Sequence, residues 1–353
     1  MTSRIKKLLG KLRSKGLDGL FVTCPYNISY LTGTRSRDSY LLVSRNKLVY
    51  FTDSRYTEEA RRDLKGIAQV RQYKPPVWEE VGREARRLKL GNLGYEEKKL
   101  SVFNWRLLSE ACGDESFLRP ASGLVEELRL IKSPGELKDI RTACSIAMDC
   151  LRFASQVVVP GRTELEVTGE LERFLRYRGA HAASFDIIVA SGPNSSLPHH
   201  VTAERRLREG DPVYIDMGVD YRGYRSDLTR VFFLGKITVL VQRVYNVVTE
   251  AQQKAIRLIR PGARAADIDS CARGYITSRG FGSGFSHALG HGVGLDVHEG
   301  PRIAPGVETR LEEGMVFTIE PAVYIPKKFG IRVEDMVLVT RNGSEVLSGS
   351  LNK

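Results

Sequence analysis

The sequence has few cysteines and no long apolar run. Its five cysteines are odd in number and show no CxxC spacing, which argues against a disulfide framework or a zinc knuckle and predicts reduced thiols in a cytoplasmic protein. No apolar run reaches the roughly 18 residues of a membrane-spanning helix. The basic start lacks the apolar core and cleavage site of a secretory signal. We therefore expect neither secretion nor membrane insertion.

Acidic residues are also in deficit, and the deficit is uneven. The chain has 42 Asp+Glu against 54 Lys+Arg, a formal net charge of +12, and residues 1–126 alone carry 24 basic and 15 acidic residues. A basic front half could contact nucleic acid or a ribosome. Its cations are interspersed with acidic residues at helical spacing, which is more typical of a solvated surface. Nucleic acid is therefore not an expected partner.

The length of 353 residues suggests two domains. Short apolar strands alternate with helical stretches over residues 1–125, which predicts a small α/β domain with a mixed sheet. Ser133-Pro134 is a helix-start signal, and helical periodicity continues to Val157. We place the domain boundary close to Val125, with a second domain over residues 126–353.

The second domain contains an internal duplication. Two helix, Pro-Gly turn, helix segments are followed in each copy by two strand segments that align in order: 157–180 with 257–280, 210–217 with 314–321, and 223–232 with 330–339. The alignment superposes Asp216 on Glu320 and Asp227 on Glu334. Two such halves facing each other would bring four carboxylates to one pseudo-two-fold axis.

Four converging carboxylates cannot all be ionised without compensating positive charge, which predicts one or two divalent cations. All six histidines lie at or after position 181, and three of them fall in HALGHGVGLDVHEG (residues 287–300). Glycines in that segment allow backbone to approach a crowded centre. Carboxylates with one or two imidazoles suit manganese or another fairly hard ion. Any one of these residues alone could be a cap or a surface group, but the ordered set favours a site.

The order of these motifs resembles the pita-bread metallopeptidases, specifically their proline-peptidase branch, which contains Xaa-Pro aminopeptidase and prolidase. The residues that carry the resemblance are PHH (198–200), Asp-x10-Asp, the histidine box and the two glutamates, with NISYLTG (27–33), TDSRYTEEA (52–60) and RLIKSPGE (129–136) outside them. The resemblance implies an α/β protein: a creatinase-like N-terminal domain followed by a duplicated pita-bread catalytic domain.

The resemblance also implies a set of site residues. The implied ligands of two divalent metal ions, Mn²⁺ first and Co²⁺ or Zn²⁺ as alternatives, are Asp216, Asp227, His291, Glu320 and Glu334. The implied catalytic groups are His199, His287, His298, Glu320 as proton shuttle, and Arg332, with Tyr324 shaping the pocket. The sixth histidine that is left over, His181, has no matching role. The chain departs from the family at His200 and Ala322, where glycine is common, and at Ala288, where glycine or serine is usual.

The function expected first is a metal-dependent Xaa-Pro aminopeptidase acting on peptides with proline at the second position, as a homodimer. The alternative is an Xaa-Pro dipeptidase, in which a basic group such as Arg35 or Arg37 binds the substrate carboxylate. A non-catalytic pita-bread binding protein or a metal-free creatinase-like hydrolase is disfavoured because every ligand and site histidine is present. Methionine aminopeptidase is disfavoured because it generally lacks such an N-terminal domain and the first histidine of the box.

Overall fold

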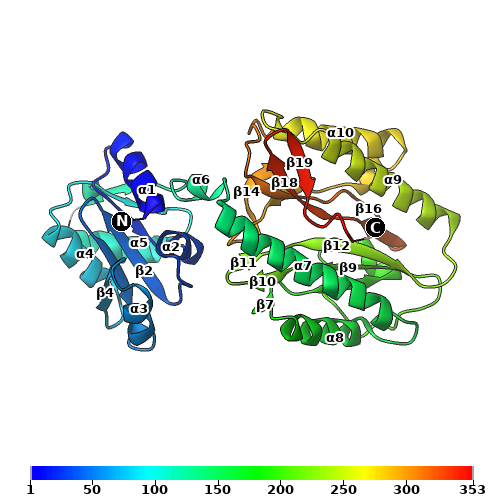
Figure 1. Cartoon of the computed structure of the whole chain (residues 1–353), viewed down its shortest axis with the longest axis horizontal. Helices are drawn as coiled ribbons and strands as arrows, with labels where there is room; N and C mark the ends of the chain where they lie inside the picture. Colours follow the sequence, from blue (N-terminus) through cyan, green and yellow to red (C-terminus); the bar gives the residue numbers. More distant parts are fainter. Residues whose placement is uncertain (1, 114, 352–353) are drawn as a thin grey trace. The chain divides into compact units, whose positions relative to one another are not determined.

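A computed structural model describes residues 2–113 and 115–351. The chain divides into two compact units, Met1–Arg129 and Leu130–Lys353 (Figure 1). The division therefore falls just after Val125, where the motif pattern changes. Each unit is described by itself below.

The first unit is a mixed sheet with helices. Its elements in chain order are α1 (Ser3–Ser14), β1 (Gly19–Val22), α2 (Pro25–Thr32), β2 (Ser39–Ser44), β3 (Leu48–Thr52), α3 (Thr57–Asp63), β4 (Gln69–Gln72), α4 (Trp78–Arg87), β5 (Leu93–Tyr95), α5 (Val102–Cys112), η1 (Glu115–Phe117), β6 (Leu118–Pro120) and α6 (Glu126–Arg129). The sheet order is β4-β3-β2-β1-β5-β6. The β1–β2 and β2–β3 pairs are antiparallel and the other three are parallel, which confirms the predicted mixed sheet.

The central strands of this sheet are apolar at nearly every position because both faces are covered. Strands β1 and β3 are buried throughout, as expected for strands between two layers. On one face, Trp78, Val81 and Ala85 of α4 pack with Phe21 and Phe51 of the sheet. The spacing of those three helix residues places them on one side of α4.

The second unit consists of two similar halves. The first half contains α7 (Pro134–Val157), α8 (Glu164–Tyr177), β7 (Ala182–Ala183), β8 (Ile188–Ser191), η2 (Gly192–Ser196), β9 (Pro212–Met217), β10 (Val219–Tyr221), β11 (Tyr224–Arg225) and β12 (Leu228–Phe233). The second half contains α9 (Val239–Arg257), α10 (Ala265–Ser278), η3 (Gly282–Gly284), β13 (Gly290–Gly292), β14 (Glu299–Ile303), β15 (Val316–Ile319), β16 (Ala322–Ile325), β17 (Phe329–Arg332), β18 (Asp335–Thr340) and β19 (Gly343–Val346).

Helix α7 begins and ends where the sequence predicts. Ser133 is its N-cap, Pro134 is its first residue, and the side chains and backbones of Ser133 and Glu136 form a reciprocal capping box. This arrangement satisfies two backbone N–H groups that would otherwise lack partners at the helix start. The helix continues to Val157.

Both halves carry the same backbone contacts, which supports the duplication. The Gly161 amide donates to the Leu207 carbonyl (2.9 Å), and the Gly262 amide donates to the Leu311 carbonyl (2.8 Å). Gly161 and Gly262 belong to the two Pro-Gly turns, and each turn is followed by the second helix of its half. The same sequence pattern has therefore produced the same turn twice.

The helices and sheets of the two halves are arranged alike. Strands run β12-β9-β8 in one sheet and β14-β13-β15-β18-β19 in the other. Helices α7 and α8 contact first-half strands such as β8 and β10, and α9 and α10 contact second-half strands such as β14 and β17 (Figure 1). Across residues 2–113 and 115–351, no helix has both the length and the apolar character needed to cross a membrane.

Candidate active site

The four predicted carboxylates lie at matching positions of two antiparallel strand pairs. Asp216 lies in β9 opposite Thr229 of β12, and Asp227 directly precedes β12. Glu320 directly follows β15, and Glu334 directly precedes the partner strand β18. An isolated bridge between Thr229 and Glu334 joins the two pairs. The internal repeat therefore brings acidic side chains from both halves to one place.

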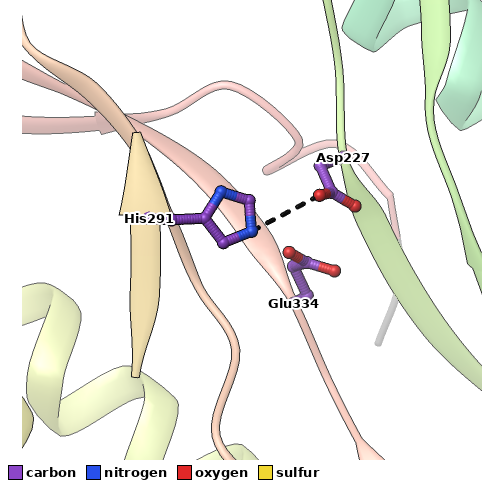
Figure 2. A group of neighbouring side chains, drawn as sticks. All are labelled: Asp227, His291 and Glu334. Atoms are coloured by element: carbon purple, nitrogen blue, oxygen red, sulfur yellow. Dashed lines mark ion pairs between the residues drawn. The ribbon is translucent and has the colours of Figure 1, made fainter. Parts of the chain in front are cut away.

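Three of the predicted ligands form a tight cluster. Ligand atoms of Asp227, His291 and Glu334 all lie within 4.8 Å of one another (Figure 2). Nε2 of His291 lies 3.6 Å from Oδ2 of Asp227 and 3.3 Å from Oε1 of Glu320. His291 is carried by β13 of the second half, which faces the carboxylates. Four of the five predicted ligands therefore lie around one point.

The fifth, Asp216, is held beside this cluster by Arg332. Its Oδ2 accepts a hydrogen bond from Nη2 of Arg332. Its Oδ1, like Oδ1 of Asp227, is buried and accepts no hydrogen bond from any residue that the structure describes. Because a carboxylate oxygen has only lone pairs to offer, such atoms call for a cation. The oxygen-rich donor set with one imidazole fits a fairly hard divalent ion.

Burial and mutual repulsion perturb these groups strongly. Burial raises the pKa of Glu320 to about 8, with Asp216 raising it further and Arg332 opposing the rise. The pKa values of Asp227 and Glu334 are also raised well above their usual range, first by burial and then by the other carboxylates. Burial lowers the pKa of His291 to about 4, which keeps its ring neutral at pH 7, as a metal ligand requires.

These shifts predict how the stability of the metal-free protein depends on pH. The raised pKa of Glu320 means that stability is lost as pH rises from the usual carboxyl range toward about 8. The lowered pKa values of His287 and His291 instead cost stability as pH falls from 6.5 toward about 4. Only the carboxylates act between pH 6.5 and 8, so the melting temperature of chelated protein should fall across that window. The slope is at most about 1.4 kcal/mol per pH unit for each proton released.

Thermal unfolding in chelator and in excess Mn²⁺ measures this effect. Manganese should raise the melting temperature more at pH 8 than at pH 6.5, because cations bind the deprotonated carboxylates. A melting temperature of chelated protein that rises from pH 6.5 to 8 would contradict the assignment of these groups as a repulsive cluster.

Glycines of the histidine box allow the strand carrying His291 to lie against its neighbours. A Cβ at Gly290 would be 1.9 Å from the carbonyl oxygen of Thr318, and a Cβ at Gly292 would be 1.9 Å from that of Gly300. Real Cβ atoms do not approach so closely, and hence only glycine fits at these two positions. This is the close backbone approach that the glycine-rich sequence predicts.

The remaining predicted groups surround the cluster. The ring of His298 lies 4.2 Å from that of His291, and Nε2 of His287 lies 3.3 Å from the hydroxyl oxygen of Tyr324. Nη1 of Arg332 donates to that hydroxyl oxygen (2.6 Å). Arg332 therefore links the Asp216 carboxylate to the hydroxyl that faces His287.

All the predicted site residues line one cavity of about 850 Å³ in the second unit. Those residues are His199, Asp216, Asp227, His287, His291, His298, Glu320, Tyr324, Arg332 and Glu334. Arg35 and Arg37 belong to the first unit and are not among its lining residues. The exposed His181 is not among them either.

Sequence reasoning missed several groups that hold the site. The Thr229 hydroxyl donates to Oε2 of Glu334 (2.7 Å), and the Thr318 hydroxyl donates to Oε1 of Glu320 (3.2 Å). Arg302 lines the same cavity. The two threonines lie two residues from predicted ligands within the strand motifs, which was a usable signal. Arg302 follows the histidine box by a few residues and carried no such signal.

A duplicated α/β unit whose two halves converge four carboxylates and a neutral histidine on one buried point defines a metallohydrolase. Residues 138–341 match Metallopeptidase family M24, and residues 4–131 match the Creatinase/Prolidase N-terminal domain. The chain belongs to metallopeptidase family M24, whose members use divalent metals. The predicted family, the proline-peptidase resemblance and the pita-bread fold are confirmed.

Individual relatives match over the whole chain. An Xaa-Pro dipeptidase of Pyrococcus furiosus is 36% identical over 350 residues, which cover 99% of this chain and 98% of the relative. A solved Xaa-Pro dipeptidase from Bacillus anthracis is 37% identical with a TM-score of 0.94, covering 99% of this chain and 98% of the other. A solved X-Pro aminopeptidase from Thermotoga maritima MSB8 is 34% identical with a TM-score of 0.88, covering 98% and 97%.

Proposed function

We propose that this metallopeptidase is an Xaa-Pro dipeptidase. The observation that carries the proposal is the full-length similarity to two Xaa-Pro dipeptidases at 36% and 37% identity, together with a single cavity that contains every expected site residue. The aminopeptidase expected first from the sequence becomes the second candidate. It is favoured by the similarity to the Thermotoga maritima X-Pro aminopeptidase.

We propose as ligands of two divalent cations, Mn²⁺ first, the residues Asp216, Asp227, His291, Glu320 and Glu334. Bound there, the cations would supply a water of lowered pKa and positive charge for the scissile carbonyl oxygen. Asp227, His291 and Glu334 already lie close enough to share one ion. Arg332 orients Asp216 through its hydrogen bond to Oδ2.

The proton steps are assigned to the chain's own side chains. Glu320 takes a proton from the attacking water and delivers it to the leaving prolyl nitrogen. That nitrogen belongs to a tertiary amide without hydrogen, so it leaves as a secondary amine only after protonation. His298 donates a hydrogen bond to the developing oxyanion. His199 and His287 line the substrate side of the cavity.

A dipeptide substrate carries a free carboxylate close to the scissile bond, and the cavity offers a cation for it. Among the described residues that line the cavity, two are arginines, Arg302 and Arg332. Arg332 is buried and hydrogen-bonded to Asp216, Tyr324 and the Pro198 carbonyl. Arg302 is exposed on β14. We therefore propose Arg302, in place of Arg35 or Arg37, as the group that binds the substrate carboxylate.

Hydrolysis of Ala-Pro, Ala-Pro amide and Ala-Pro-Ala in Mn²⁺ and in chelator tests the proposal. The wild-type protein should hydrolyse Ala-Pro with a kcat/KM at least tenfold above that for Ala-Pro-Ala, and chelator should abolish both. Arg302→Met should lower kcat/KM for Ala-Pro by roughly 10- to 100-fold, the loss of one charge-assisted hydrogen bond of about 1.5–3 kcal/mol. Its effect on Ala-Pro amide should be less than threefold.

Arg35→Met and Arg37→Met are the matched controls and should leave all three rates unchanged. Faster hydrolysis of Ala-Pro-Ala than of Ala-Pro would favour the aminopeptidase. Absence of metal-dependent hydrolysis of any of the three substrates would favour the non-catalytic binding protein. A homodimer and a cytoplasmic location remain predictions.

A further inference from the structure

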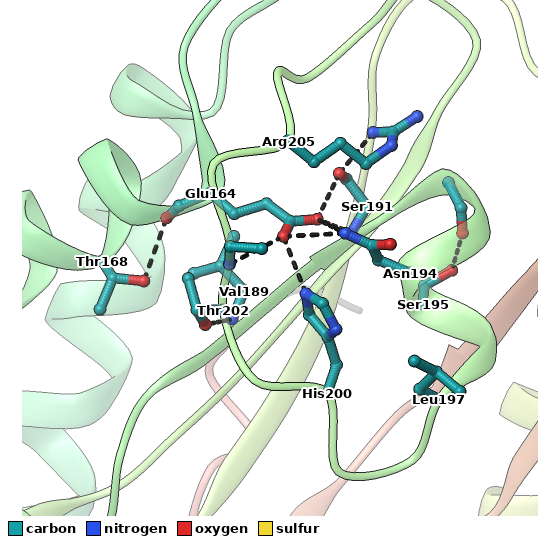
Figure 3. Close-up of polar contacts among 12 residues, drawn as sticks. Glu164, Thr168, Val189, Ser191, Asn194, Ser195, Leu197, His200, Thr202 and Arg205 are labelled. Carbon is teal, nitrogen blue, oxygen red and sulfur yellow. Dashed lines mark hydrogen bonds and ion pairs between the residues drawn. The ribbon is translucent and has the colours of Figure 1, made fainter.

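A fully buried carboxylate lies behind the segment that carries His199. Glu164 is the first residue of α8 and has no exposed surface. Its Oε1 accepts hydrogen bonds from the Ser191 amide (2.8 Å) and hydroxyl (2.6 Å), and its Oε2 accepts one from the Ala203 amide (3.2 Å). Nδ2 of Asn194 lies 3.2 Å and 3.1 Å from the two oxygens. Figure 3 shows the carboxylate at the centre of these groups.

The partner of this carboxylate that the family resemblance does not predict is His200. Nε2 of His200 lies 2.8 Å from Oε2 of Glu164, and 8% of the His200 side chain is exposed. An ionised carboxylate can only accept, so Nε2 of the imidazole carries the hydrogen. The nearby cation Arg205 is directed elsewhere, to the Ser191 hydroxyl (2.5 Å) and to Asp211 (2.7 Å). His200 is therefore the titratable side chain hydrogen-bonded to Glu164.

The other side of His199 is held from the catalytic side of the cavity. The Pro198 carbonyl accepts a hydrogen bond from Nη1 of Arg332 (3.1 Å), and the Leu197 carbonyl accepts one from the Tyr214 hydroxyl (2.7 Å). His199 thus lies between a residue held by Arg332 and a residue held by Glu164. A glycine at position 200, as is common in the resembling family, would have no side chain to make the second contact.

We propose that His200, through its hydrogen bond to Glu164, is a positioning residue that fixes the backbone at His199 and so aims the His199 ring into the substrate cavity. This inference rests on the proposed function insofar as His199 acts on substrate. Its geometric content is independent of that function. The ring of His200 ties the segment to α8, a rigid element, and a site supported by a rigid element is held more accurately than one on a loop alone.

The kinetic test is a double-mutant cycle with a conservative rescue. His200→Ala should lower kcat/KM for Ala-Pro about tenfold or more, as expected when a group near the reacting atoms is misplaced, with bound metal unchanged. His200→Gln keeps a donor toward Glu164 and should stay within threefold of wild type. In a His199→Ala background, His200→Ala should change the rate less than twofold, because its effect passes through His199.

His181→Ala is the matched control, since His181 is an exposed histidine outside the cavity lining. It should leave kinetics and metal content unchanged. A full tenfold loss from His200→Ala in the His199→Ala background overturns the proposal, because the effect then does not pass through His199. An equal loss from His200→Gln and His200→Ala also overturns it.

Hydrogen exchange of the backbone amides supplies a readout that does not depend on catalysis. The Ala203 and Leu197 amides should exchange about tenfold faster in His200→Ala than in wild type or His200→Gln, while α7 amides stay unchanged. Equal exchange in all three proteins overturns the positioning role. If no Xaa-Pro substrate is hydrolysed yet the exchange pattern appears, the proposed function fails and the positioning contact stands.

Discussion

Asp227→Asn is expected to lower Ala-Pro hydrolysis at least a thousandfold while leaving the protein folded. Asp227 lies within ligand distance of both His291 and Glu334, and an amide is a much weaker ligand for a divalent cation than a carboxylate. Loss of this ligand removes the positive charge that would activate water and polarise the carbonyl, a contribution of several kcal/mol. Steady-state kinetics and metal content by elemental analysis measure the two losses together.

The same substitution should stabilise the metal-free protein at pH 8. Burial and the neighbouring carboxylates raise the pKa of Asp227 well above its usual range, so the folded metal-free protein is penalised for the charge that asparagine lacks. Chelated Asp227→Asn should melt above chelated wild type, and wild type in Mn²⁺ should melt above both. Asp267→Asn, which removes an exposed carboxylate paired with Arg264, is the control and should change little. Full activity and metal content in Asp227→Asn would refute the assignment of the ligand.

Glu320→Gln is expected to lower kcat by roughly 100- to 10,000-fold, the usual contribution of a positioned proton-transfer group. Glutamine keeps the size of the side chain but cannot accept the proton of the attacking water. Because the other four ligands remain, bound metal should fall much less than the rate. The measurement is kcat for Ala-Pro at saturating Mn²⁺, with metal content determined on the same sample.

Glu308→Gln is the matched control, since Glu308 pairs with Arg264 in an exposed position. It should keep wild-type kinetics. If Glu320→Gln retains full metal-dependent hydrolysis, Glu320 does not carry the proton. If metal and rate are lost in equal proportion, its contribution is that of a ligand alone.

Local patterns were enough to identify much of the fold. The capping box at Ser133 and Glu136 is formed by neighbouring residues, so it could be read directly from the chain. The same holds for the turns that contain Gly161 and Gly262, because each uses a Pro-Gly pair and is repeated in the other half. Such features depend on interactions between residues a few positions apart.

The repeated carboxylates could also be predicted, because each lies at the same place in its strand pair. Asp216 and Asp227 flank one antiparallel connection, and Glu320 and Glu334 flank its counterpart. A duplication therefore says that the four side chains share one axis. It does not say which oxygen lies beside which cation, since that depends on how the two halves pack.

The sequence by itself determined the duplicated architecture, the acidic and histidine residues of the site, and hence the class of chemistry, because periodicity, caps and repeats are written locally along the chain. Only the tertiary structure decided that Arg332 holds Asp216, that Arg302 lines the cavity, and that His200 contacts Glu164. These contacts join residues far apart in the sequence. Their geometry arises from the packing of whole strands and helices, for which no local pattern carries a signal.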